Sequence, residues 1–322
     1  MVNKTVKGEK GMKKALVAGA TGGMGYALVQ ELRRRNIEVI AFARGEQKLK
    51  ELFNNMPGVA VRAGDALLEK DIIHAADGVD VLFHAISFPY QEWETTHPLA
   101  LKNMLRAAKG QEAKFALVDN IYAYGRQTDS PIDEAAKKEP HTKKGSIRLE
   151  MENVIKTSGV PYLIVHMPDF YGPNAGNTVL NETLKNVALN KTANFIGSPS
   201  LAKEFLFTED GAKAMIELAL RENAYNQNWN IPGVSPITGN EMKELLQTEW
   251  NYSKNFRTVS KTMIKFMALF NPFMKELIEM MYLYEQPVLL SGKKYEEQIG
   301  PLARTSYKQG IKITLDYMKS NR

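Results

Sequence analysis

The stretch ALVAGATGGMG at residues 15–25 decides the fold of this chain of 322 residues. It opens with a short, continuously apolar run, which is typical of a buried strand. Three glycines follow, at positions 19, 22 and 25, and behind them apolar residues recur on one face of a predicted helix, at Ala27, Leu28 and Leu32. A strand, a glycine-rich turn and a helix in direct succession predict the first unit of a doubly wound α/β domain.

The same alternation continues outward from this stretch. Apolar runs at residues 37–42, 59–61, 79–83, 114–118 and 162–166 predict further strands, and helices are expected at about 98–109 and 147–157. Continuously apolar strands separated by helices indicate a parallel sheet covered on both faces. We therefore expect an α/β fold, a Rossmann-type doubly wound parallel sheet with a smaller, mostly helical C-terminal substrate cap. The predicted boundaries are a disordered tail at 1–12, the nucleotide-binding domain at 13–170 and the cap at 171–322, with later segments free to complete the sheet.

The composition excludes several classes of protein. There is no cysteine and the five histidines are isolated, so we expect neither a thiolate nucleophile nor a metal site. The net charge of +6 is spread along the chain, without the basic run that a nucleic-acid partner requires. Residues 1–14 do not resemble a secretory signal, and Met1 and Met12 are both candidate start residues. No segment has the ~18 consecutive apolar residues that a membrane span requires. We expect a soluble, cytoplasmic protein with no membrane partner.

The glycine loop predicts a site for a dinucleotide. Gly19 permits the tight turn, Gly22 lets the backbone approach a pyrophosphate, and Gly25 allows the helix to pack closely on the strand. The N–H groups at the start of the helix then face the phosphates. The remaining loop residues that we expect to contact the cofactor are Thr21, Gly23 and Met24. The alternative interpretation is a purely structural turn.

The end of the second strand indicates which nucleotide binds. An NAD enzyme usually places an acid there to hold the ribose 2′-hydroxyl, whereas this chain has Arg44 and no acid before Glu46. A guanidinium can grip a 2′-phosphate, so NADP is favoured over NAD, although a solvated arginine is the simpler alternative. Asp65, followed by Ala66, could accept a hydrogen bond from the adenine or merely close a turn. Ala85 lies where a small residue lets the cofactor pass.

Together these residues resemble the extended short-chain dehydrogenases/reductases, the superfamily of nucleotide-sugar epimerases and dehydratases. The resemblance covers about residues 14–240 and rests on the glycine loop and several further motifs, namely Asp65, Phe83-His-Ala85, Asn103, Tyr124-Gly125, Asp169-Phe-Tyr-Gly-Pro173 and Phe207-Thr-Glu-Asp210. It implies a Tyr-x-x-x-Lys catalytic pair assisted by Ser or Thr. Here Lys144 stands at the tyrosine position, Arg148 at the lysine position and Asn120 at the serine position, as in the atypical branch of the superfamily.

The altered positions leave four residues as candidates for catalysis. Arg148 could hold the ribose or a phosphate, and Asn120, with Asp119 before it, could orient the substrate or the nicotinamide amide. Lys144 beside Arg148 would have its pKa pushed downward if it were buried, which suits a general acid. The alternative is an ordinary surface lysine. Tyr122, with Arg126 four residues on, could supply a phenol from another direction.

A methionine-rich stretch, Met263–Tyr284, has apolar residues near helical spacing with a break at Asn271-Pro272. We interpret it as two core helices of the cap rather than a membrane-surface or partner helix, because Lys265, Lys275, Glu276 and Glu279 give it charge of mixed sign.

The sequence leaves two main hypotheses for function, besides a third, a sugar-nucleotide binder without hydride chemistry. The first is an NADP-dependent oxidoreductase or epimerase/dehydratase-like enzyme that acts on a small carbonyl or sugar-type substrate, with Tyr122 or Lys144 handling the proton. The alternative is a non-catalytic NADP-binding redox sensor. By analogy with the extended superfamily, helices near 98–109 and 146–157 would pair two copies into a homodimer.

Overall fold

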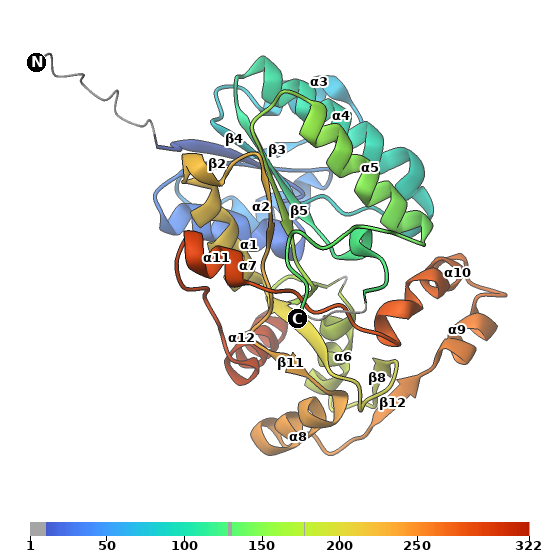
Figure 1. Cartoon of the computed structure of the whole chain (residues 1–322). Coiled ribbons are helices and arrows are strands. Elements are labelled where there is room, and N and C mark those ends of the chain that lie inside the picture. The colour runs from blue at the N-terminus through green and yellow to red at the C-terminus, as the bar shows by residue number, and fades with distance from the viewer. Residues whose placement is uncertain (1–10, 128–130, 177, 322) are drawn as a thin grey trace, which may run out of the picture.

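The computed structural model describes residues 11–127, 131–176 and 178–321. The tail predicted at residues 1–12 falls mostly outside the described residues. Within them the chain folds around one large parallel sheet flanked by helices (Figure 1). This confirms the predicted fold class.

The large sheet has seven strands, and every pair of neighbours is parallel. From edge to edge the order is β10 (Gln227–Asn230), β6 (Tyr162–His166), β5 (Lys114–Asp119), β4 (Val81–His84), β1 (Lys14–Ala18), β2 (Glu38–Ala43) and β3 (Val59–Ala63). The order reverses between β1 and β4, and an open α/β sheet binds its ligand at the carboxyl ends of the strands beside such a switch point. The last strand, β10, comes from far beyond residue 170.

Helices cover both faces of this sheet, because its central strands are apolar on both sides. One face packs on α3 (Glu69–Ala75), α4 (Trp93–Gly110) and α5 (Lys143–Thr157). The other packs on α1 (Gly23–Arg34), α2 (Glu46–Phe53) and α7 (Thr208–Ala219). Short 3₁₀ turns interrupt the connections at η1 (Tyr90–Glu92), η2 (Tyr122–Tyr124) and η3 (Glu222–Ala224).

The C-terminal part is helical, as predicted, and also contains two small sheets at the carboxyl edge of the large one. One consists of β11 (Pro236–Ile237), β9 (Lys203–Phe207) and β7 (Asp169–Tyr171), and the other of β12 (Phe256–Val259) and β8 (Ala193–Ile196). The helices of this part are α6 (Val179–Ala188), α8 (Gly239–Trp250), α9 (Lys261–Met267), α10 (Pro272–Ile278), α11 (Lys293–Gln298) and α12 (Tyr307–Ser320), with the 3₁₀ turn η4 (Glu279–Tyr284) after α10.

The methionine-rich stretch forms a helical hairpin, α9 and α10, with the break at Asn271-Pro272 as expected. Its inner side is core: Ile264, Met280 and Met281 are buried. The interpretation as two core helices is nevertheless wrong for the outer side, since Phe266 and Phe270 are 67% and 82% exposed. A residue pattern alone does not reveal that no other element of the described residues covers this side.

Candidate functional site

The glycine loop packs so closely on its neighbours that two of its positions have no room for a side chain. Gly19 has φ +87°, and a Cβ there would lie 2.4 Å from the carbonyl oxygen of Ala85. A Cβ on Gly25 would lie 2.1 Å from the carbonyl oxygen of Gly19. Both positions therefore require glycine. Helix α1 then begins after Gly22, which makes no side-chain cap, and its first turn has no acidic residue. Its N-terminal N–H groups thus form an anion-binding end.

The other predicted cofactor contacts gather at the same edge of the sheet. Gly19 N–H donates to the Phe42 carbonyl (2.9 Å), which ties the loop to the end of β2 two residues before Arg44. Arg44 is exposed. Ala85 N–H donates to the Ala18 carbonyl (2.9 Å), so the end of β4 lies directly beside the loop. The C-terminal part also contacts the loop, because the side-chain amide of Asn174 donates a hydrogen bond to the carbonyl oxygen of Thr21 (3.0 Å).

Asp65 and Ala66 follow β3 at the far side of this edge. Asp65 accepts a hydrogen bond from the N–H of Leu67 (3.0 Å), so its carboxylate closes a turn. The buried amide of Asn103 donates to the carbonyl oxygen of Ala66 (2.9 Å), which fixes this turn to α4. Helix α1 also approaches the cap closely, since a Cβ on Gly23 would lie 2.6 Å from that of Ala175.

Two of the three altered catalytic positions, Asn120 and Arg148, come together with Asp119 at the carboxyl end of β5. Asp119 is buried there, and its Oδ1 atom lies 3.4 Å from Nη1 of the Arg148 guanidinium. The other face of the guanidinium lies over the Trp93 ring, 4.8 Å from its centroid. Asn120 donates its N–H to Asp119 (2.8 Å) and accepts through its side chain from Tyr122 N–H (2.9 Å). The structure thus joins Asp119, Asn120 and Arg148 into one group.

Lys144 is not a surface lysine, and that interpretation is wrong. Its side chain is 1% exposed, and Nζ lies 2.6 Å from Glu276 Oε2 and 2.5 Å from Glu279 Oε1. The ammonium also lies over the Tyr90 ring, 4.9 Å from its centroid. The Lys144 ammonium is therefore neutralised by two carboxylates, Glu276 from α10 and Glu279 from η4. Sequence analysis missed this role of Glu276 and Glu279, because they are more than 130 positions from Lys144.

Tyr122 lies in η2 beside this group, within a layer of aromatic side chains. Its hydroxyl is 2.8 Å from that of Tyr90, and its ring stacks on Trp93. Burial raises the pKa of Tyr122 well above the usual value, so the phenol keeps its proton at neutral pH. Arg126 does not join it: its guanidinium lies 3.8 Å from Glu285 and over the Tyr282 ring.

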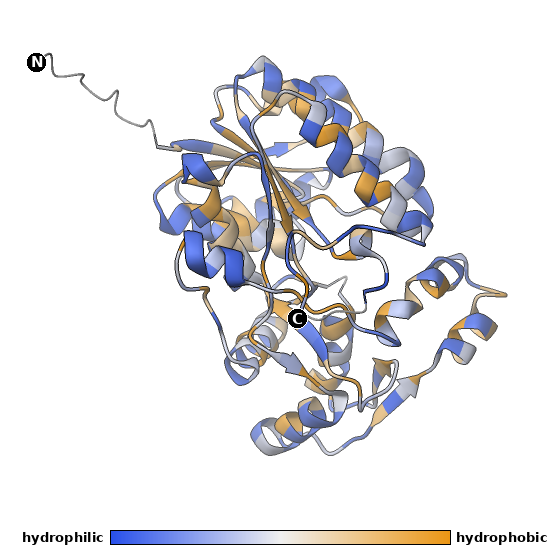
Figure 2. Cartoon of the chain, viewed as in Figure 1, coloured by the Kyte–Doolittle hydropathy of each residue, from blue (hydrophilic) through white to orange (hydrophobic). Residues whose placement is uncertain are grey.

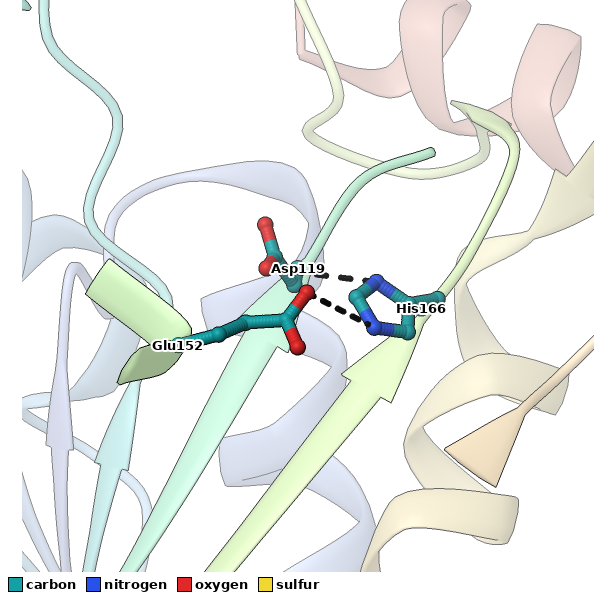
Figure 3. A group of neighbouring side chains, drawn as sticks. All are labelled: Asp119, Glu152 and His166. Carbon is teal, nitrogen blue, oxygen red and sulfur yellow. Dashed lines mark ion pairs between the residues drawn. The ribbon is translucent and has the colours of Figure 1, made fainter. Parts of the chain in front are cut away.

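Behind Asp119 lies a buried polar cluster (Figure 3) that the sequence did not predict. His166 Nε2 is 3.4 Å from Glu152 Oε1, and His166 Nδ1 is 3.9 Å from Asp119 Oδ2. Their potential ligand atoms lie within 4.8 Å of one another, which is compatible with a metal ion. The Lys138 ammonium is already there, 2.5 Å from Glu152 and 2.8 Å from His166. An internal cation therefore neutralises the cluster.

A small cavity of about 30 Å³ lies where the sheet meets the C-terminal part. It is lined by side chains from β7, β9, the end of η4 and the segment after it, among them Asp169, Lys203 and Tyr284. Burial lowers the pKa of Lys203 to about 8, although Asp169 opposes this. Burial also raises the pKa of the neighbouring Glu204 to about 7. The pKa values of these two groups are thus shifted towards neutral pH at this junction, and neither residue was predicted from the sequence.

The chain is similar to a known protein family and to characterised folds. Residues 19–194, more than half of the chain, match the family of NAD(P)H-binding domains. A relative from Bacillus subtilis, the uncharacterised UDP-glucose epimerase YtcB, is 25% identical over 243 residues, which cover 68% of this chain and 77% of the relative.

Solved structures share the fold over 96% of this chain. UDP-glucuronic acid 4-epimerase from Bacillus cereus, in complex with NAD, superposes with a TM-score of 0.79 at 18% identity and is covered over 99% of its length. UDP-glucose 4-epimerase from Thermotoga maritima, with UDP-glucose, gives a TM-score of 0.78 at 17% identity, also over 99% of its length. The resemblance predicted from the motifs is confirmed: the chain belongs to the NAD(P)H-binding family and has the fold of the extended short-chain dehydrogenases/reductases of the epimerase/dehydratase type.

Proposed function

We propose that this protein is an NADP-dependent oxidoreductase or epimerase/dehydratase-like enzyme for a small carbonyl or sugar-type substrate. The observation that carries the proposal is the glycine cradle before α1, with an uncapped helix N-terminus, tied by hydrogen bonds to the end of the strand that precedes Arg44. The pyrophosphate would be held by the loop residues Gly19, Thr21, Gly22, Gly23, Met24 and Gly25, and the 2′-phosphate by Arg44. Asp65 and Ala66 would contact the adenine end, and Ala85 would leave room for the cofactor to pass along β4.

Arg148 and Asp119 would hold the nicotinamide end of the cofactor. Among the described residues, Arg148 Nε and Asp119 Oδ2 are buried without a hydrogen-bond partner, so a donor and an acceptor remain for ribose hydroxyls or the amide group. A bound nicotinamide supplies or accepts the hydride. The residues of the chain orient the reacting carbonyl and move its proton.

Tyr122 is the proton donor that the geometry supports best. Its neutral phenol can give a proton to a substrate oxygen, and Tyr90 is within hydrogen-bond distance to share the resulting charge. Lys144 is a weaker candidate, because two carboxylates hold its ammonium.

The experiment is a fluorescence titration with NADPH and NADH of the wild type, Arg44→Ala and the control Arg257→Ala. Arg257 is an equally exposed arginine on β12, remote from the glycine loop. Loss of a charge-assisted contact to the 2′-phosphate should weaken NADPH binding about tenfold or more and leave NADH binding unchanged. The control should match the wild type. If neither nucleotide binds, the proposal fails; if NADH binds more tightly and Arg44→Ala changes nothing, the cofactor is NAD.

The replaced Tyr-x-x-x-Lys pair favours a second candidate, a non-catalytic NADP-binding redox sensor. A turnover assay with NADPH and a panel of small carbonyl compounds, and with NADP and UDP-glucose, separates the two. Turnover that falls by about 10²-fold or more in Tyr122→Phe supports the enzyme. Tight NADPH binding without turnover of any substrate would support the sensor.

A further inference from the structure

The exposed side of the α9–α10 hairpin presents three large apolar side chains to solvent. Phe266, Leu269 and Phe270 are 67%, 73% and 82% exposed, the highest values among the large apolar residues of the described chain. The two phenylalanine rings lie 6.2 Å apart, and all three residues belong to the last turn of α9 and the bend after it. We refer to them as the hairpin tip.

The hairpin tip lies at the outer edge of the molecule. Figure 1 shows α9 and α10 extending away from the sheet, with the bend between them farthest out, and Figure 2 shows hydrophobic colour at this bend. The inner side of the hairpin is anchored by a separate apolar cluster that includes Ile264 and Leu277. The tip is thus an extra apolar surface on an element that is already packed.

Basic residues lie on both sides of this tip in the sequence, and one of them, Lys261, is paired with Glu285 (2.7 Å). Between Lys254 and Lys275 the chain has five basic residues and no acidic one. Lys265 and Lys275 are exposed, and no carboxylate of the described residues lies within ion-pair distance of either. The two nearby acids, Glu276 and Glu279, point inward and bind Lys144. The mixed charge seen in the sequence is therefore separated in space, and the side that faces outward is basic.

We propose that the hairpin tip docks this protein on an anionic lipid surface. Aromatic and leucine side chains at such a tip enter the boundary between headgroups and acyl chains, while lysines beside them bind the anionic headgroups. Charge complementarity distinguishes this occupant from a second copy of the chain, whose own hairpin would bring like charges together. No helix of the described residues is long and apolar enough to cross a membrane, so contact would be at the surface.

The test is co-sedimentation of the full chain with vesicles of phosphatidylcholine and phosphatidylserine, and with vesicles of phosphatidylcholine alone. We expect binding to the anionic vesicles that weakens with added salt, and little binding to the neutral ones. Lys265→Glu/Lys275→Glu should weaken binding about 25-fold or more, because each lysine near an anionic surface is worth about fivefold. The matched control, Lys109→Glu/Lys319→Glu, reverses the charge of two exposed lysines elsewhere on the protein. Its affinity for the anionic vesicles should fall much less.

The apolar contribution is tested with Phe266→Ser/Leu269→Ser/Phe270→Ser. Its affinity should fall to about a tenth or less, whereas Leu189→Ser/Leu220→Ser, a control at other exposed leucines, should bind as the wild type does. Phe270→Trp should shift its emission to shorter wavelength when anionic vesicles are added. Unchanged thermal midpoints verify that the variants fold. The proposal is overturned if the triple variant binds as well as the wild type, if no vesicle binds at low salt, or if light scattering shows a dimer that the triple variant dissociates.

Discussion

At the scale of single residues, Glu152 should make the stability of the protein depend on acid. Its carboxylate is fully buried; burial alone raises its pKa, but His166 and Lys138 outweigh burial and lower it to about 2. Because the pKa is lower in the folded state, the ionised carboxylate stabilises the protein fully at pH values above the unfolded-state pKa of about 4.5. This stabilisation is lost as the pH falls towards 2. Protonation of Glu152 should therefore lower the free energy of unfolding by about 2 kcal/mol between pH 7 and pH 3.

Urea denaturation of the wild type and Glu152→Gln at these two pH values measures this contribution. The glutamine variant cannot titrate at this position, so its stability should fall by about 2 kcal/mol less than that of the wild type over the same interval. Glu150→Gln is the control: it lies two residues before Glu152 on α5 but is exposed, and it should keep the wild-type pH dependence. Parallel losses in all three proteins would show that the buried cluster does not carry the acid sensitivity.

Single residues also show how far the site was predictable from sequence. The glycines at 19 and 25 were predicted because their spacing reflects a backbone requirement that is local in the chain. Arg148 and Asn120 were found because the family's motifs fix their positions. Lys138, His166 and Glu152 were not predicted to meet, since they come from a loop, a strand and a helix and only the folded sheet brings them together. Contacts of this kind carry no local signal.

At the scale of elements, the ion pairs of Lys144 should hold the α9–α10 hairpin and η4 against α5. The lysine is 1% exposed, whereas Glu276 and Glu279 are 32% and 27% exposed. Replacing both acids by glutamine leaves a buried ammonium without a carboxylate, which should destabilise this segment by about 3 kcal/mol. Lys144→Met should cost at most about 1 kcal/mol, because the two acids can turn towards water.

Hydrogen exchange of residues 261–284 measures both effects. In Glu276→Gln/Glu279→Gln the exchange of this segment should be about 100-fold faster, with β1 and β4 unchanged. Glu296→Gln/Glu297→Gln on α11 replaces two acids outside the hairpin and serves as the control. If exchange in the hairpin were faster in Lys144→Met than in the double variant, the difference in burial between the lysine and the two acids would not determine how the hairpin is held.

Elements differ in how well the sequence predicts them, for a physical reason. The strands β1, β4 and β5 are almost wholly buried, so their continuous apolar runs were visible. Strand β9 was missed because it opens with Lys203 and Glu204, which are buried beside a cavity rather than in an apolar layer. Strands β8 and β12 pair across some sixty positions as a small separate sheet, and four residues are too few to show a period.

At the scale of the whole molecule, the order of elements predicts that the nucleotide-binding half does not fold alone. The family match ends at residue 194, but α7 and the edge strand β10 come later in the chain. Strand β10 completes the sheet beside β6, and α7 contributes Met215, Ile216 and Leu218 to the same core as the apolar face of α1. Without these elements one face of the sheet would lie open to water.

A fragment of residues 11–194 should therefore lack a cooperative unfolding transition and bind a hydrophobic dye, because a core left open loses several fully buried side chains worth about 1.5–3 kcal/mol each. The comparison is residues 11–322, which should unfold in one transition by circular dichroism and calorimetry. A fragment of residues 11–235 retains both α7 and β10 and should regain part of the cooperativity. If residues 11–194 unfolded cooperatively and bound NADPH as the longer chain does, α7 and β10 would be accessories to a self-sufficient domain, and the cofactor site would depend only on the first six strands of the sheet.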